Sequence, residues 1–61
     1  GEVQWTLDLF SRKHGEHGLA TLGGIARLEA RAERDLAGGD TPLGLCEHLS
    51  REYVSALGKT A

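Results

Sequence analysis

The stretch from Asp40 to Leu57 constrains the fold most, because it predicts a helix that is apolar around about half its circumference. Thr41 is a favoured N-cap residue, and Pro42 suits the first helical position, where its missing N–H is not needed. A helix that packs on one neighbour needs an apolar stripe only a little over ~100° wide, so this helix is expected to touch two surfaces. The apolar arc, interrupted only by Ser50, consists of Leu43, Leu45, Cys46, Leu49, Tyr53, Val54, Ala56 and Leu57.

Length and charge limit the class of protein. The chain of 61 residues is expected to form one domain, and a chain of this size buries only about 60% of its unfolded surface. A single cysteine forms no internal disulfide, so a second chain is the expected source of further buried surface. The net charge of -2 argues against nucleic acids and membrane surfaces as partners, because both attract an excess of Lys and Arg. The lone thiol, without an apolar run of membrane-spanning length, is typical of a cytoplasmic protein.

Glycines divide the chain into three segments. Gly15 and Gly18 mark the first break. Gly38 and Gly39 mark the second, shortly before the predicted cap at Thr41, as expected where one helix ends and the next begins.

We therefore predict an all-α fold, a small three-helix domain with helices over residues 3–14, 19–37 and 42–57. The last two helices are expected to form a hairpin across the glycine turn, and the domain is expected to be dimeric. Gly23 and Gly24 weaken the start of the second helix, because glycine costs about 1 kcal/mol relative to alanine within a helix. The predicted core consists of Leu7, Phe10, Ile25, Leu28, Leu36, Leu49, Tyr53 and Leu57.

The first segment fits two structures. Its apolar residues alternate with polar ones, which is the pattern of a half-buried strand. Helical spacing also fits, because Val3, Leu7 and Phe10 share one face. We favour the helix, on which Trp5 and Leu9 project away from that face and form a second apolar patch.

The alternative is a strand-helix-helix chain that intertwines with a second copy, the order found in small dimeric DNA-binding regulators of the ribbon-helix-helix type. In that arrangement Gln4 and Thr6 would face the bases, whereas Asp8 would oppose the phosphates. The acidic balance of the chain makes this the second hypothesis.

Residues 50–57 loosely resemble the second helix of helix-turn-helix DNA-binding domains. The sequence departs from that pattern at the turn, where His48 replaces the usual glycine and Glu47 takes a normally apolar position. Both departures favour one unbroken helix through the region.

Four side chains are of types that bind zinc, namely His14, His17, Cys46 and His48. Their spacing is poor, because Cys46 and His48 are two residues apart and point to nearly opposite sides of a helix. Burial of Cys46 in the apolar arc would also raise its thiol pKa, which opposes nucleophilic catalysis. We predict no catalytic, cofactor-binding or metal-binding residues.

The leading hypothesis is a non-enzymatic association module that binds a second copy of itself or a larger protein subunit. Arg27, Arg31 and Arg34 share one face of the second helix and are candidate contacts for an acidic partner, although a solvated helix face is the simpler interpretation. The predicted partner-binding residues are Trp5, Leu9, Leu43, Leu45, Leu49, Val54 and Ala56.

Overall fold

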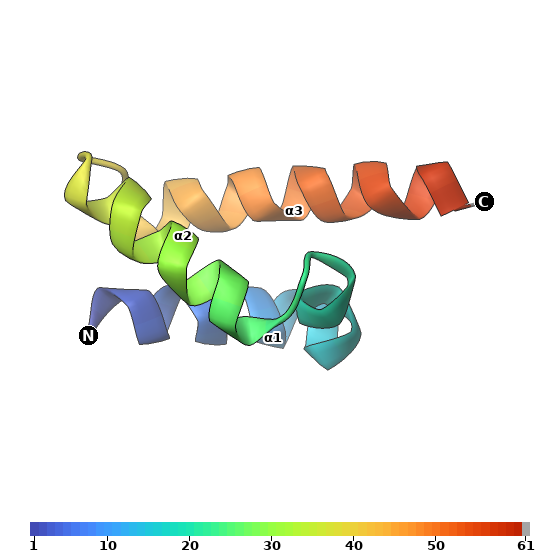
Figure 1. Cartoon of the computed structure of the whole chain (residues 1–61), viewed down its shortest axis with the longest axis horizontal. Coiled ribbons are helices and arrows are strands. Elements are labelled where there is room, and N and C mark those ends of the chain that lie inside the picture. The colour runs from blue at the N-terminus through green and yellow to red at the C-terminus, as the bar shows by residue number, and fades with distance from the viewer. Residues whose placement is uncertain (61) are drawn as a thin grey trace.

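A computed structural model describes residues 1–60 and contains three helices and no strand in that range. The helices are α1 (Glu2–Thr21), α2 (Ile25–Ala37) and α3 (Pro42–Thr60). α1 and α3 run side by side in the same direction, and α2 crosses obliquely in the opposite direction (Figure 1). α1 packs against both other helices, whereas α2 and α3 contact each other much less. The all-α prediction is confirmed.

α1 consists of two helical pieces that meet at Gly15. This glycine has φ of 73° and ψ of 179°, a backbone conformation that L side chains rarely adopt. The predicted break after His14 is therefore present, and the chain resumes a helix up to Thr21. Gly18 in the second piece packs closely on the first, since a Cβ atom there would lie only 3.0 Å from the ring of Phe10.

The prediction of one helix over residues 19–37 is wrong in its first part. Leu19 belongs to the end of α1, and the chain then turns through Gly23 and Gly24, whose φ angles are 106° and 92°. A right-handed helix does not continue through two successive residues with positive φ, so α2 begins only at Ile25. The glycine pair therefore ends one helix instead of merely weakening the start of the next.

The start of α3 agrees with the prediction in detail. Pro42 is the first helical residue, and the hydroxyl oxygen of Thr41 accepts a hydrogen bond from the backbone N–H of Gly44 at 3.0 Å. This bond satisfies one of the four N–H groups that a helix start leaves unpaired. α3 continues past the predicted end at Leu57, and its last turns extend beyond the other two helices (Figure 1).

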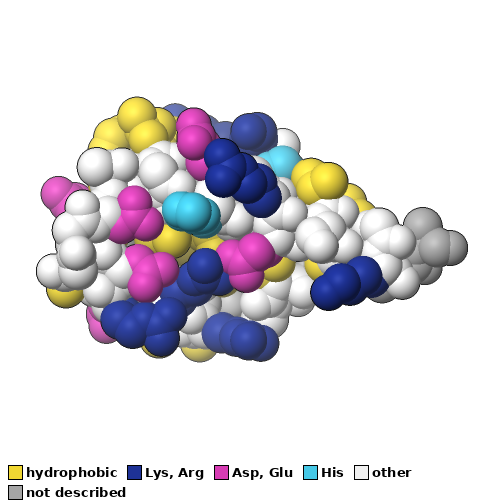
Figure 2. Space-filling view, turned by 90° about the horizontal axis from the view of Figure 1, so that it is seen from above, with side chains coloured by type: hydrophobic (Ala, Val, Ile, Leu, Met, Phe, Trp, Pro, Cys, Tyr) yellow, Lys and Arg dark blue, Asp and Glu magenta, His cyan; other side chains and the backbone are white. Residues whose placement is uncertain are grey.

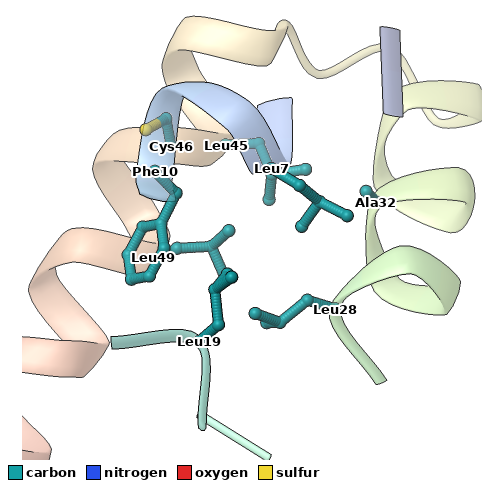
Figure 3. Close-up of a cluster of buried hydrophobic side chains, with 8 residues drawn as sticks. All are labelled: Leu7, Phe10, Leu19, Leu28, Ala32, Leu45, Cys46 and Leu49. Carbon is teal, nitrogen blue, oxygen red and sulfur yellow. The ribbon is translucent and has the colours of Figure 1, made fainter. Parts of the chain in front are cut away.

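The core fills the space where the three helices meet (Figure 3). Four of the predicted core residues are buried there, and Leu36 and Tyr53 pack against them partly exposed. Ile25 and Leu57 were predicted as core and are exposed. Ile25 is the first residue of α2, and Leu57 lies on the extending end of α3, so neither is enclosed by neighbouring helices. The buried cluster consists of Leu7, Phe10, Leu19, Leu28, Ala32, Leu45, Cys46 and Leu49.

Candidate interaction surfaces

The wide apolar arc of α3 faces the core along one edge and solvent along the other. Leu45 is 1% exposed, whereas Leu43 is 62% exposed only two residues earlier. Val54 is exposed on the outer edge, and Ala56 is half-buried. Leu45 and Leu49 were predicted as partner-binding residues, but they lie in the core of this chain and do not reach the surface.

Apolar side chains that are exposed or partly exposed lie on the early turns of α1 and α3. Trp5 is 48% exposed and stands one helical turn before Leu9 on α1. Leu9 lines a shallow pocket together with Leu43, and the polar side chains at its edge are Lys13 and Glu47. We call Trp5, Leu9 and Leu43 the amino-terminal patch. Its flanks carry one positive and one negative charge, and neither charge has an ion pair within residues 1–60.

Cys46 lies at the edge of the core beside this patch. It is buried, and its sulfur points away from the other core side chains (Figure 3). Burial raises the pKa of the Cys46 thiol, Lys13 opposes this effect, and Glu47 adds to it. The direction of this shift agrees with the prediction, and it is opposite to the lowered pKa that a nucleophilic cysteine needs.

A polar contact inside the α1–α3 interface was not predicted. Nε2 of His14 lies 2.8 Å from the hydroxyl oxygen of Ser50, at hydrogen-bonding distance. The His14 ring also packs between two aromatic rings, 4.8 Å from Phe10 and 4.9 Å from Tyr53, measured between centroids. The signal was present in the sequence, because Ser50 is the one polar residue within the apolar arc and His14 shares a face with Phe10.

The three arginines of α2 do not form a row of free cations. Arg31 pairs with Asp35 at 3.3 Å and with Glu52 of α3, and Arg34 pairs with the same Asp35 at 3.3 Å. Arg27 has no ion pair within residues 1–60.

The pKa values of this network reflect its ion pairs. Burial lowers the pKa of Arg31, but hydrogen bonds and charges from Glu52 and Asp35 outweigh it, so the net pKa is raised. Burial raises the pKa of Asp35, but its pairs with Arg34 and Arg31 hold the net pKa below the usual value. The guanidinium of Arg31 and the carboxylate of Asp35 are thus both charged at neutral pH.

A cleft separates α2 from α3 on the side opposite the amino-terminal patch. Its α2 end has a volume of about 370 Å³, and it continues past Leu22 and Arg27 toward the end of α3. Viewed from the α3 side, basic side chains lie along the lower edge of the molecule, and further basic side chains lie toward the upper edge beside hydrophobic ones (Figure 2). The Arg31–Glu52 ion pair connects the two walls of this cleft.

Within residues 1–60 the structure contains no cluster of three or more His, Cys, Asp and Glu side chains placed to hold a metal ion. None of the helices described has the length and apolarity needed to cross a membrane. Comparison with protein-family models, with curated proteins and with solved structures found no match to this chain.

Proposed function

We propose that the protein is a non-enzymatic association module that pairs with a second copy of itself through the amino-terminal patch. The observation that carries the proposal is the exposure of Trp5, one helical turn before Leu9, which shares a pocket with Leu43. Tryptophan is enriched at positions that contribute most of the energy of protein interfaces. Pairing would also supply the buried surface that a domain of 61 residues lacks.

The charges that flank the patch favour a second copy as the partner. A two-fold symmetric interface brings the same surface of both subunits together, so it must be self-complementary. Lys13 and Glu47 border the same apolar pocket with opposite charges. In a two-fold pair, Lys13 of one copy would face Glu47 of the partner subunit, and two such contacts would flank the apolar centre.

Val54 extends this surface along α3. It borders a mostly apolar hollow that also includes Lys13 and Ser50, so Lys13 adjoins both apolar areas. Ala56 instead borders the cleft toward α2. The proposed contact surface therefore contains the patch and Val54, and it excludes Ala56.

The ribbon-helix-helix hypothesis depends on a strand in the first segment. Residues 3–9 lie within α1, and no strand occurs in residues 1–60. The helical first segment supports the association module, and the intertwined strand-helix-helix dimer stays a prediction.

The chain contains one tryptophan, so its fluorescence reports on the patch alone. We expect the emission of Trp5 to shift to shorter wavelength as protein concentration rises, in step with the mass measured by sedimentation equilibrium. Trp5→Ala should weaken association by about thirtyfold, because truncating an interface tryptophan often costs 2 kcal/mol or more. The matched control is Ile25→Ala, since Ile25 is 53% exposed and lies outside the patch.

Two results would contradict the proposal. One is a chain that stays monomeric at all accessible concentrations, with unchanged Trp5 emission. The other is an equal loss of association in Trp5→Ala and Ile25→Ala. If Trp5→Ala instead lost helicity by circular dichroism at unchanged mass, Trp5 would be part of the core and the interface would be misplaced.

Exchanging the charges of Lys13 and Glu47 tests directly whether the partner is a second copy of the chain. Lys13→Glu and Glu47→Lys should each weaken association, because like charges would then meet across the interface. The double variant K13E/E47K should recover most of the affinity. Failure of the double variant to recover would exclude the two-fold arrangement.

A further inference from the structure

We propose that the cleft between α2 and α3 binds an acidic amphipathic segment of a protein partner. This site is separate from the amino-terminal patch and does not depend on it. Leu43 of the patch and Glu52 of the cleft are nine residues apart on α3, so they lie on opposite sides of this helix.

The cleft concentrates positive charge in an acidic protein. The chain has seven Lys and Arg and nine Asp and Glu. Four of the seven cations line the cleft, but only one of the nine acids, Glu52, does so. The cations are Arg27, Arg31, Arg34 and Lys59.

Two of these cations are available to a ligand. Arg31 and Arg34 are held by Asp35 and Glu52, whereas Arg27 and Lys59 have no ion pair within residues 1–60. Gly23 leaves room for Arg27, because a Cβ atom at position 23 would lie 2.6 Å from Cδ of the arginine. The turn before α2 thus lets the Arg27 side chain lie beside the backbone at Gly23.

The apolar part of the cleft favours a protein segment over a nucleic acid. Leu22, which is partly exposed, lines it beside the cations, and Ala56 lines it on α3. A segment that carries apolar side chains between its carboxylates matches both features. A phosphodiester backbone carries no apolar side chains and would leave Leu22 and Ala56 unmatched.

Glu52 competes with an acidic ligand for the cations of the cleft. Its carboxylate pairs with Arg31 across the mouth of the cleft. Because its side chain is about half exposed, the pair is weak and a carboxylate of the ligand can replace it. Removing the charge of Glu52 should therefore increase affinity for an acidic ligand, whereas loss of a purely structural residue would reduce it.

The probe is a fluorescently labelled peptide of about 15 residues, long enough to form a short helix, composed of Leu, Ala and Glu with the Glu residues four apart. The control is the same peptide with Gln in place of Glu. We expect the Glu peptide to bind, with an affinity that falls as salt is added, and the Gln peptide to bind at least tenfold more weakly. Equal binding of the two peptides would overturn the proposal, and so would tighter binding of duplex DNA than of the Glu peptide.

Variants locate the site. The double variant R27Q/K59Q should weaken binding of the Glu peptide by about tenfold, whereas R12Q/R51Q, which removes the same charge outside the cleft, should change it less than twofold. Glu52→Gln should tighten binding by about threefold. Circular dichroism of each variant checks that helicity is kept, because Lys59 also lies in the last turn of α3, where a cation stabilises the helix.

Equal effects of the two double variants, or weaker binding by Glu52→Gln, would exclude the cleft as the site. Trp5→Ala should leave peptide affinity unchanged while it weakens self-association. The two proposals can therefore fail independently of each other.

Discussion

α3 meets its two neighbours in different ways. Against α1 it places buried leucines, edge-to-face contacts between aromatic rings and the His14–Ser50 contact. Toward α2 it contributes its share of the three-helix core and, within residues 1–60, one ion pair, and an open cleft lies between the two helices. Buried apolar packing stabilises a domain by several kcal/mol, whereas a partly exposed ion pair contributes less than about 1 kcal/mol.

This difference separates the part of α3 that holds the fold from the part that is free to bind. α1 packs extensively against both α3 and α2, so α2 is held mainly through α1. A ligand between α2 and α3 would therefore displace one weak contact and leave the core intact. The three predictions below test this division, from the largest expected effect to the smallest.

The largest effect is expected for Leu45→Glu. Leu45 is almost completely buried between the helices, and a buried, ionised carboxylate without a partner costs several kcal/mol. This loss is comparable with the whole stability of a domain of this size, about 3–9 kcal/mol. We expect the variant to lose its helical circular dichroism at 25 °C.

Leu43→Glu is the matched control, because it introduces the same charge two residues earlier on the exposed edge. It should stay helical and lose self-association. A folded Leu45→Glu variant would show that the α1–α3 contact is not the core of this domain.

A smaller loss is expected for His14→Ala. The substitution removes the hydrogen bond to Ser50 and the ring contacts with Phe10 and Tyr53, which together should cost about 1–3 kcal/mol. Urea denaturation followed by circular dichroism measures the change. His48→Ala alters an exposed histidine and should stay within about 0.5 kcal/mol of the parent. Equal values for the two variants would mean that the His14 contact adds nothing to stability.

The smallest effect is expected for Glu52→Gln. Loss of its pair with Arg31 should reduce the free energy of unfolding by less than about 1 kcal/mol, and added salt should shrink the difference further. Denaturation at low and high salt gives both values. A loss of 2 kcal/mol or more would show that the α2–α3 boundary is structural, and it would weaken the argument for a ligand there.

Local signals in the sequence were sufficient to predict three helices, but not all of their ends. The Thr41 cap, the Pro42 start and the glycine at position 15 each act within a few residues, so spacing alone predicts them. The break at Gly23 and Gly24 was underestimated, because glycine lowers helix stability without specifying its own φ angle. Only the surrounding structure decides whether such a pair is tolerated or ends the helix.

Contacts between helices were predicted less well. Periodicity defines an apolar arc, but it does not say where a neighbouring helix begins or ends, so Ile25 and Leu57 were placed in the core. The arc of α3 was expected to have an inner and an outer edge, and the structure assigns Leu45 to the inner one and Leu43 to the outer one. The spacing of residues along the sequence could not predict the cleft, because Lys59 and Arg27 lie on different helices.

The extending end of α3 has an energetic consequence of its own. Helical turns without a covering neighbour open readily, so the wall that carries Lys59 is among the least protected parts of the described chain. Binding there would order these turns and would lose conformational entropy, which lowers affinity but leaves selectivity for carboxylates unchanged. The cleft would consequently favour rapid, reversible exchange of ligands over long residence.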